Sequence, residues 1–282
     1  MKTRDRFEAK DIKLIEPLEK IAICATVNPE GLPHLTFINS LMALDERSMA
    51  FGQFIRGDSK WFMQNYPRIS FFILSPHVKR MWLGKAKWTH KKSGGPELER
   101  YKEMPMQRYN AYFPINVVHY LDLVETTGAL KLPVPAILFS SILTGLAKRR
   151  AATRLDDRIL KPYAEKLFNK LTTFKFFSFV GNDGYPQIVP FVQCMAVDSR
   201  RLAFSPALLG EKVKALAPGT DVAAYCLSTT LESVLTRGTF LGYRKYLGIK
   251  LGIIDINWVY NSMPPNAGQI YPEIKLEPVV DF

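Results

Sequence analysis

The chain has 282 residues, of which 47% are hydrophobic and 23% are charged, and its formal net charge is +12 at pH 7. This composition excludes a disordered or collagen-like chain, and the length allows two modest domains that each bury a core. The positive charge favours an anionic partner: a phosphate-bearing cofactor, nucleic acid or an acidic membrane surface. The sequence carries no zinc-finger, recognition-helix or RNA-binding signature, so we do not expect nucleic acid as the partner.

The N-terminal segment and the cysteines indicate where the protein works. The start, MKTRDRFEAKDIKLIEPLEK, is charged and has no apolar h-region, so we expect no secretory signal and a cytoplasmic protein. Cys24, Cys194 and Cys226 lie in apolar runs without the spacing of metal ligands. They are typical of buried thiols in a reducing compartment, and a single disulfide is the alternative.

The first part of the chain predicts short β-strands, rich in β-branched and aromatic residues and separated by Gly, Pro and Asp turns. These strands cover residues 20–27, 33–41, 48–53, 69–74, 79–89 and 116–125. Between the third and fourth strands, SKWFMQNYPR predicts a short helix that Ser59 caps and that ends before Pro67. Residues 96–112 predict a further helical segment.

The middle of the chain, residues 131–171, predicts helices. PVPAILFSSILTGLAKRR begins with prolines suited to a helix start and ends in a cationic turn, and its apolar stretch from Val134 to Ala147 is too short to span a bilayer. A second helix follows and restarts at Pro162. We expect these helices to pack on the β-domains. Docking of the apolar stretch and of basic residues 148–150 on a membrane surface is the alternative.

The last part of the chain repeats the first. Its predicted strands cover residues 174–180, 186–194, 201–205, 221–227, 233–243 and 252–261, with a short helix at 211–217. Four landmarks match at one spacing of 153 (184 − 31): Gly31 with Gly184, Pro33 with Pro186, Asp45 with Asp198, and Phe51 with Phe204. We predict a mainly β chain with helical insertions (α+β), in which domains 1–130 and 172–282 flank the insert 131–171 and form an internal pseudo-dimer.

Residues 26–74 carry a resemblance to a known family. They read TVNPEGLPHLTFINSLMALDERSMAFGQFIRGDSKWFMQNYPRISFFIL, which looks like the hairpin, strand, Ser-x-Lys-type helix start, Asn-Pro-like turn and apolar strand of the FMN-binding split-barrel family, the pyridoxamine-phosphate-oxidase-like flavoproteins. The pattern returns, diluted, in the second copy. The resemblance implies a six-stranded Greek-key split barrel in each copy. Family members are usually homodimers that bind FMN between subunits, so here the two copies would supply both halves and the chain would be a monomer or weak dimer.

The resemblance also implies a cofactor site in the first copy. Family members hold the flavin phosphate with basic and hydroxyl side chains, and the matching positions are Gln53, Arg56, Ser59 and Lys60. The strand from Phe37 to Leu41 would line the flavin ring, with polar contacts from Asn39 and Ser40. Independently of the family, a phosphate dianion binds to charge-assisted donors at a helix N-terminus. A solvated surface turn is the alternative reading of the same residues.

The second copy departs from this pattern, because Pro206 stands where the first copy has Gln53 and only Lys212 remains near the helix start. We therefore predict one FMN per chain. Trp258, on the closing strand of the second copy, is a candidate neighbour of the flavin ring, and ordinary core packing is its alternative.

The sequence names no catalytic residue. His34, His77, His90 and His119 are isolated from one another, no metal-ligand spacing occurs, and no nucleophile elbow or nucleotide loop is present. The prediction is a flavin-dependent oxidoreductase that acts on an unidentified small molecule, with the redox chemistry supplied by the cofactor. The alternatives are the same fold with a deazaflavin or haem, and a cofactor-free scaffold protein that docks through its basic helical insert.

Overall fold

The computed structural model describes residues 2–16, 19–54, 57–104, 115–153, 157–207, 209–261 and 268–274. The chain forms two compact units: Met1–Val134 with Phe177–Val189, and Pro135–Phe176 with Pro190–Phe282. The predicted domain limits, which follow the repeat, stay a prediction.

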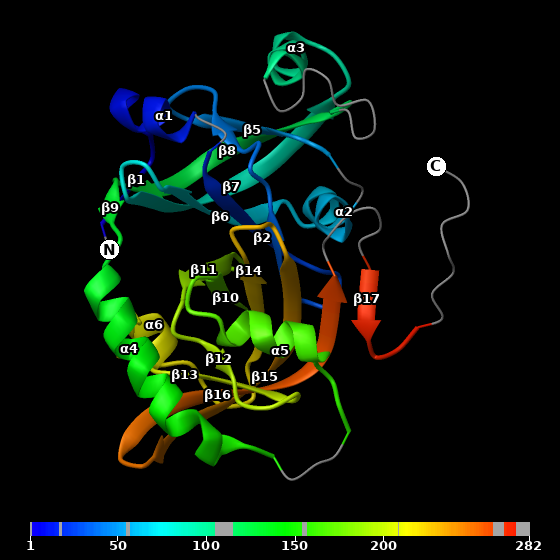
Figure 1. Ribbon diagram of the computed structural model, residues 1–282. Coiled ribbons are helices and arrows are strands. Elements are labelled where there is room, and N and C mark those ends of the chain that lie inside the picture. Colours follow the sequence, from blue (N-terminus) through cyan, green and yellow to red (C-terminus); the bar gives the residue numbers. More distant parts are fainter. Residues whose placement is uncertain are drawn as a thin grey trace. The chain divides into compact units, whose positions relative to one another are not determined.

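The first sheet has nine strands within the described residues, in the order β3-β2-β6-β7-β8-β5-β4, with β1 paired to β8 and β9 paired to β7 (Figure 1). These strands are β1 (Thr3–Arg4), β2 (Ile21–Val27), β3 (Pro33–Phe37), β4 (Met42–Ala43), β5 (Ser48–Gly52), β6 (Arg68–Ser75), β7 (Arg80–Lys92), β8 (Val118–Thr127) and β9 (Leu130–Lys131). The helices of this part are α1 (Ala9–Ile15), α2 (Asp58–Asn65) and α3 (Pro96–Glu103).

The second sheet has eight strands in the same part of the chain that the structure describes, in the order β11-β10-β14-β15-β16-β13-β12, with β17 paired to β16. These strands are β10 (Phe174–Val180), β11 (Pro186–Pro190), β12 (Met195–Ala196), β13 (Arg201–Phe204), β14 (Asp221–Leu227), β15 (Ser233–Tyr246), β16 (Ile249–Asn261) and β17 (Gly268–Tyr271). The helices are α4 (Val134–Ala147), the 3₁₀-helix Lys148–Ala151, α5 (Pro162–Asn169) and α6 (Glu211–Lys214).

The two strand orders are the same topology written twice. Replacing β2 to β8 by β10 to β16 converts the first order into the second. The predicted fold class, mainly β with helical insertions and two tandem split barrels, is confirmed, and so is the duplication.

The Gly-x-Pro turn shows why the repeat keeps glycine. Gly31 has φ +79° and Gly184 has φ +74°, a conformation that L side chains rarely adopt. Each turn is closed in the same way, because Gly31 N–H donates to Asn28 O at 3.0 Å and Gly184 N–H donates to Gly181 O at 2.9 Å. The sequence signal therefore marks a backbone requirement that both copies share.

The Asp turns of the two copies also match. The carboxylate of Asp45 accepts the N–H groups of Arg47 and Ser48, each at 2.7 Å. Asp198 accepts the N–H groups of Arg200 and Arg201 at 2.8 and 2.9 Å. These side chains satisfy the turn backbone before β5 and β13 begin.

The predicted strand 33–41 is in fact a strand and a turn. Strand β3 ends at Phe37, and Leu41 N–H donates to Ile38 O at 3.1 Å, which separates β3 from β4. Ile38 and Leu41 are buried, so this turn lies in the core and lacks the polar composition that marks surface turns. The second copy has the same turn, in which Cys194 N–H donates to Phe191 O at 2.8 Å.

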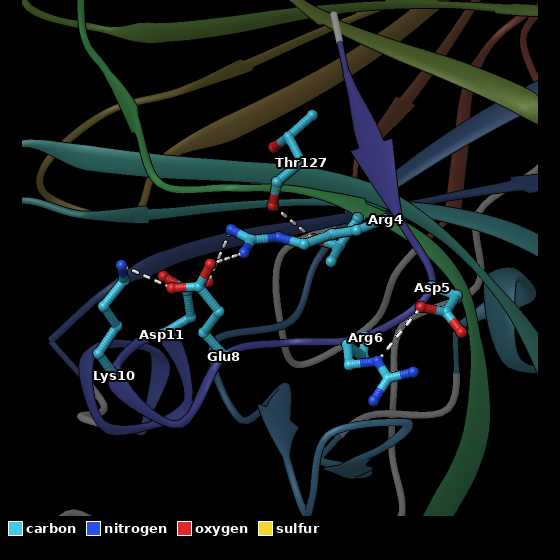
Figure 2. A network of polar contacts seen from close by, with 8 residues as sticks. Arg4, Asp5, Arg6, Glu8, Lys10, Asp11 and Thr127 are labelled. Carbon is cyan, nitrogen blue, oxygen red and sulfur yellow. Dashed lines mark hydrogen bonds and ion pairs between the residues drawn. The ribbon is translucent and has the colours of Figure 1, made fainter.

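The N-terminal segment is anchored to the first sheet by strand pairing and by charge. In β1, Thr3 lies opposite Thr127 of β8. Figure 2 shows Arg4, the last residue of β1, beside α1, where its guanidinium contacts the carboxylates of Glu8 and Asp11. The charged start therefore folds onto the sheet, because buried Asp11 gives Arg4 a fixed partner.

Two further expectations concern the cysteines and the length of the apolar helix. All three cysteines are free and buried, as predicted from their apolar surroundings, and the disulfide alternative is not realised. Among the described residues, no helix has both the length and the apolar character needed to cross a membrane.

Candidate functional site

Helix α2 begins at the position where the sequence predicted a phosphate site. Its N-cap is Gly57, with extended dihedrals of φ −111° and ψ 161°, and Ser59 lies inside the first turn. The prediction that Ser59 caps this helix is therefore wrong. The helix begins at Asp58, two residues earlier than a cap at Ser59 requires, so Gly57 is the N-cap. The first N–H groups of any helix lack intrahelical acceptors and carry partial positive charge.

Among the described residues, two side chains of this first turn have no partner of the kind that their burial calls for. Ser59 is 1% exposed, and its hydroxyl has no hydrogen-bond partner among the described residues. Lys60 is half-buried, and desolvation lowers the pKa of its ammonium from 10.5 to about 8. The carboxylate of Asp58 opposes this shift without offsetting it. A buried donor without an acceptor costs about 1–3 kcal/mol, so this turn is arranged unfavourably for a protein without a ligand.

A hydrogen-bonded chain of three side chains lies next to this turn. Trp88 Nε1–H on β7 donates to His119 Nδ1 on β8 at 3.1 Å. His119 Nδ1 therefore carries no proton, and its Nε2–H donates to Gln53 Oε1 at 2.9 Å. Because the amide oxygen of Gln53 is held in this way, its NH₂ group is turned away from His119 and remains available as a donor.

His119 is fixed in its neutral form. Its ring stacks on Phe51, with centroids 4.7 Å apart and planes 3° apart. Desolvation, and to a smaller extent the positive charges of Lys60 and Lys91, lower its pKa to about 4. The effect of Lys60 on this pKa also shows that the first turn of α2 lies close to the Trp88–His119–Gln53 chain.

Cys24 on β2 faces the same region. Burial raises the pKa of its thiol to about 12, against the opposing effect of the Lys60 charge. The thiol therefore stays protonated at neutral pH and provides Lys60 with no counter-charge. We name Gln53, Ser59, Lys60, Trp88 and His119 the α2 cluster.

The α2 cluster fits a phosphate group. It combines a helix N-terminus, an orphaned buried hydroxyl, a desolvated ammonium and an oriented amide NH₂, all of which are donors. Arg56, the remaining predicted phosphate ligand, lies outside the described residues.

The residues predicted to line the flavin ring occupy the buried turn after β3. Phe37 ends the strand, and Asn39 is half-buried in the turn. Ser40 is buried, and its hydroxyl donates to Gly52 O at 2.8 Å. At the same offset of 153 in the second copy, Gln193 Nε2 donates to Ser205 O at 3.1 Å. A bond that both copies keep favours a structural role for Ser40.

The second copy lacks every polar member of the α2 cluster. Helix α6 follows Gly210, which matches Gly57 at the repeat spacing (210 − 57 = 153), so the position of Lys60 is taken by buried Val213. Phe51 pairs with His119 across β5 and β8, whereas the matching Phe204 pairs with Gly252. Among the described residues, the second copy therefore has no counterpart of Lys60 or His119, and the exposed Lys212 takes the position of Ser59.

The two candidates in the second copy, Lys212 and Trp258, lie in different surroundings. Lys212 is exposed on the single turn of α6. The ring of Trp258 lies 3.8 Å from the Arg237 guanidinium carbon and stacks on Tyr260, and its Nε1–H donates to Gln269 Oε1 at 2.9 Å. Packing accounts for Trp258 within its own unit, and the cofactor roles of both residues stay predictions.

The sequence reasoning named Gln53, Ser59 and Lys60 but missed Trp88 and His119 as neighbours of the site. Both lie on strands that the sequence predicted, and the alternation of residues along the second of these strands places His119 on one face of the sheet. The missing information was the pairing of β8 with both β5 and β7, which joins positions 31 and 66 residues apart through His119. An unusual histidine on a predicted strand was the only sequence signal.

Comparisons with solved structures find chains that are similar to part of this one. No family model and no curated protein matches the sequence. The chain is similar to the solved structure of HupZ from Group A Streptococcus, at 14% identity and a TM-score of 0.37 over 44% of this chain and 95% of that one. It is also similar to an FMN-binding protein from Syntrophomonas wolfei (12% identity, TM-score 0.35, 43% of this chain and 84% of that one). A third similar structure is General Stress Protein 26 from Bacillus anthracis (12% identity, TM-score 0.32, 44% of this chain and 97% of that one).

Proposed function

We propose that this chain binds one FMN, with its phosphate at the α2 cluster, and that it is a flavin-dependent oxidoreductase acting on a small molecule. The observation that supports this most directly is the desolvated ammonium of Lys60 beside the unpartnered hydroxyl of Ser59, at the start of α2. A dianionic phosphate would give both groups an acceptor and would favour the charged form of Lys60, which raises its pKa. When bound, FMN supplies the redox chemistry.

The roles of the chain's own residues follow from their geometry. Lys60 and Ser59 hold the phosphate with charge-assisted and neutral hydrogen bonds, and the N–H groups of the first turn of α2 add to them. His119 holds the amide of Gln53 so that its NH₂ donates towards the ligand. His119 itself stays neutral, so it adds no charge. A second cofactor in the same chain is not part of this proposal, because Val213 and Gly252 replace the polar groups.

The first test is the visible absorption spectrum of the purified protein, with the released chromophore identified by mass. FMN supports the proposal. A deazaflavin or a haem would keep the fold and replace the cofactor. A colourless protein that takes up no added FMN would refute flavin binding and leave the scaffold function.

The second test compares FMN with riboflavin, which has the same ring but no phosphate, by the quenching of flavin fluorescence. Wild-type protein is expected to prefer FMN, and Lys60→Met is expected to weaken FMN binding by about 10- to 100-fold while changing riboflavin binding little. Lys13→Met, at an exposed position on α1, is the matched control. Equal affinities of the wild type for FMN and riboflavin would show that the phosphate is not held at α2.

A further inference from the structure

Helix α4 is amphipathic in the reverse sense from a helix that packs its apolar face on a core. Its buried residues are Ser140, Ser141, Thr144 and Ala147. Its outward residues are apolar: Leu138, Phe139, Ile142 and Leu146 are 52%, 61%, 60% and 64% exposed. A helix on the surface of a globular protein normally directs such residues inward. A single exposed apolar side chain is ordinary, but four apolar side chains on one helical face form a patch that indicates a binding surface.

The inward face is held by specific bonds, so the orientation of α4 is fixed. Thr144 Oγ1 accepts the N–H of Ser205 at 2.9 Å, and Ala147 packs in a cluster with Ala203 and Leu251. Rotating the helix to bury Leu138 and Ile142 would break these contacts. The apolar face is therefore directed outward by the structure of the second unit itself.

Positive charge adjoins this face. The 3₁₀-helix Lys148–Ala151 continues from α4, and Arg149 and Arg150 in it are exposed. Residues 126–155 contain no Asp or Glu and five Lys or Arg. The absence of carboxylates over thirty residues leaves this charge uncompensated along the chain.

The tip of the β15–β16 hairpin lies near the C-terminal end of α4. Tyr246 and Ile249 pack on the cluster that contains Ala147, so the tip lies beside the C-terminal end of α4 (Figure 1). At the tip, Leu247 is 65% exposed between the exposed Lys245 and Lys250. A second element thus presents the same combination of an outward apolar side chain and lysines.

We propose that the outward face of α4, with Arg149, Arg150 and the tip at Leu247, docks on an anionic lipid surface. The helix is about 21 Å long at 1.5 Å per residue, which suits a helix that lies in the plane of the interface. The apolar side chains enter the acyl boundary while the basic groups bind the phosphates of the headgroups. Nucleic acid has the negative charge to bind the arginines, but its phosphate backbone does not bury exposed leucine and phenylalanine side chains. A second copy of the chain would bring the same basic groups together, which opposes self-association through this face.

The experiment is sedimentation of the protein with two kinds of vesicle. One contains phosphatidylcholine alone, and the other contains phosphatidylcholine with about 30% phosphatidylserine, which makes its surface strongly anionic. We expect binding to the anionic vesicles only, weakened by high salt. Leu138→Gln with Ile142→Gln is expected to weaken binding by about tenfold or more, because two apolar side chains are lost from the interface. Arg149→Gln with Arg150→Gln is also expected to weaken it, by about 30-fold, since two basic residues near the surface are lost.

Leu231→Gln is the matched control, because Leu231 is 48% exposed and lies at the opposite end of β15 from the tip. Glutamine favours helix, and the test positions are exposed, so circular dichroism and thermal melting of the variants should match the wild type. Failure of the wild type to bind anionic vesicles, or equal binding by the α4 variants, would overturn the proposal. Equal binding to both kinds of vesicle would overturn the role of charge. A dimer in sedimentation velocity without lipid, lost in the α4 variants, would assign the face to self-association instead.

Discussion

Lys60→Met is expected to stabilise the flavin-free protein although it removes a proposed ligand. The difference between the ordinary pKa of 10.5 and the value of about 8 for Lys60 corresponds to about 3 kcal/mol at 1.36 kcal/mol per pKa unit. Since the side chain is only half-buried, solvent reduces this penalty, and we expect a gain of about 1–3 kcal/mol for the variant. The second copy already has an apolar residue, Val213, at this position.

The assay is thermal unfolding of flavin-free protein at a series of pH values. At about 2–4 °C per kcal/mol, the melting temperature of the first unit should rise by about 2–12 °C at pH 7. Because the folded pKa is lowered, the folded protein binds fewer protons than the unfolded chain between pH 8 and 10.5, so wild-type stability rises with pH in this window. The advantage of the variant is therefore complete below pH 8 and is lost towards pH 10.5.

Two further measurements separate this reasoning from a general surface effect. Lys212→Met, at the exposed lysine of α6, should leave the melting temperature unchanged. Saturating FMN should raise the melting temperature of the wild type more than that of Lys60→Met, because only a ligand that binds the folded state stabilises it. A lower or unchanged melting temperature for flavin-free Lys60→Met would refute the claim that the Lys60 ammonium is desolvated without compensation.

Three other predictions follow from the same contacts. FMN affinity should fall about tenfold from pH 7 to pH 9 as Lys60 loses its proton at about 8, and a titration of Lys60→Met should lack this fall. His119→Phe keeps a ring against Phe51 but removes the hydrogen bond to Gln53, so FMN should bind about tenfold more weakly. The double variant with Gln53→Leu should lose little more affinity than either single variant. Fully additive losses would contradict the positioning role of His119. Lys20, whose side-chain nitrogen donates to Ile15 O at 2.6 Å, has its pKa lowered by burial to about 7. Lys20→Met should therefore be more favourable to stability at pH 6, where the buried charge is itself unfavourable, than at pH 9, where the neutral amine keeps its hydrogen bond. Urea unfolding at the two pH values would show this difference, and an equal effect at both would contradict it.

The fold was predictable where backbone requirements appear directly in the sequence. Gly31 and Gly184 mark left-handed turns, Asp45 and Asp198 mark side-chain-closed turns, and the constant offset between them identified the duplication. The buried turn at Ile38–Leu41 was not predictable, because apolar residues there serve the core and leave no polar signal. Strand β1 and helix α1 were missed for the opposite reason: their charged residues find partners only after folding, as Arg4 does with Asp11.

The candidate site divides in the same way. Ser59 and Lys60 are neighbours in sequence at a helix start, so local pattern and chemistry were enough to single them out. Trp88, His119 and Gln53 come from two strands and the end of a third, and only the strand order of the sheet brings them together. A strand register cannot be derived from periodicity alone, because periodicity fixes the face of a strand but not its neighbours.

The two copies differ in the residues at their matching helix starts, and this difference bears on function. Both copies keep the turns, the buried phenylalanine of β5 and β13, and the side-chain bond made by Ser40 and Gln193, which are the features that the topology needs. At the helix start, the first copy has a desolvated lysine, Lys60, and an orphaned serine, Ser59, whereas the second copy has Val213 and Lys212 at the matching positions. Unfavourable groups persist where they serve binding or catalysis and are otherwise free to be replaced. Since the two copies share one topology, the fold does not require these two groups at the helix start, which favours the proposed role of Ser59 and Lys60 in binding.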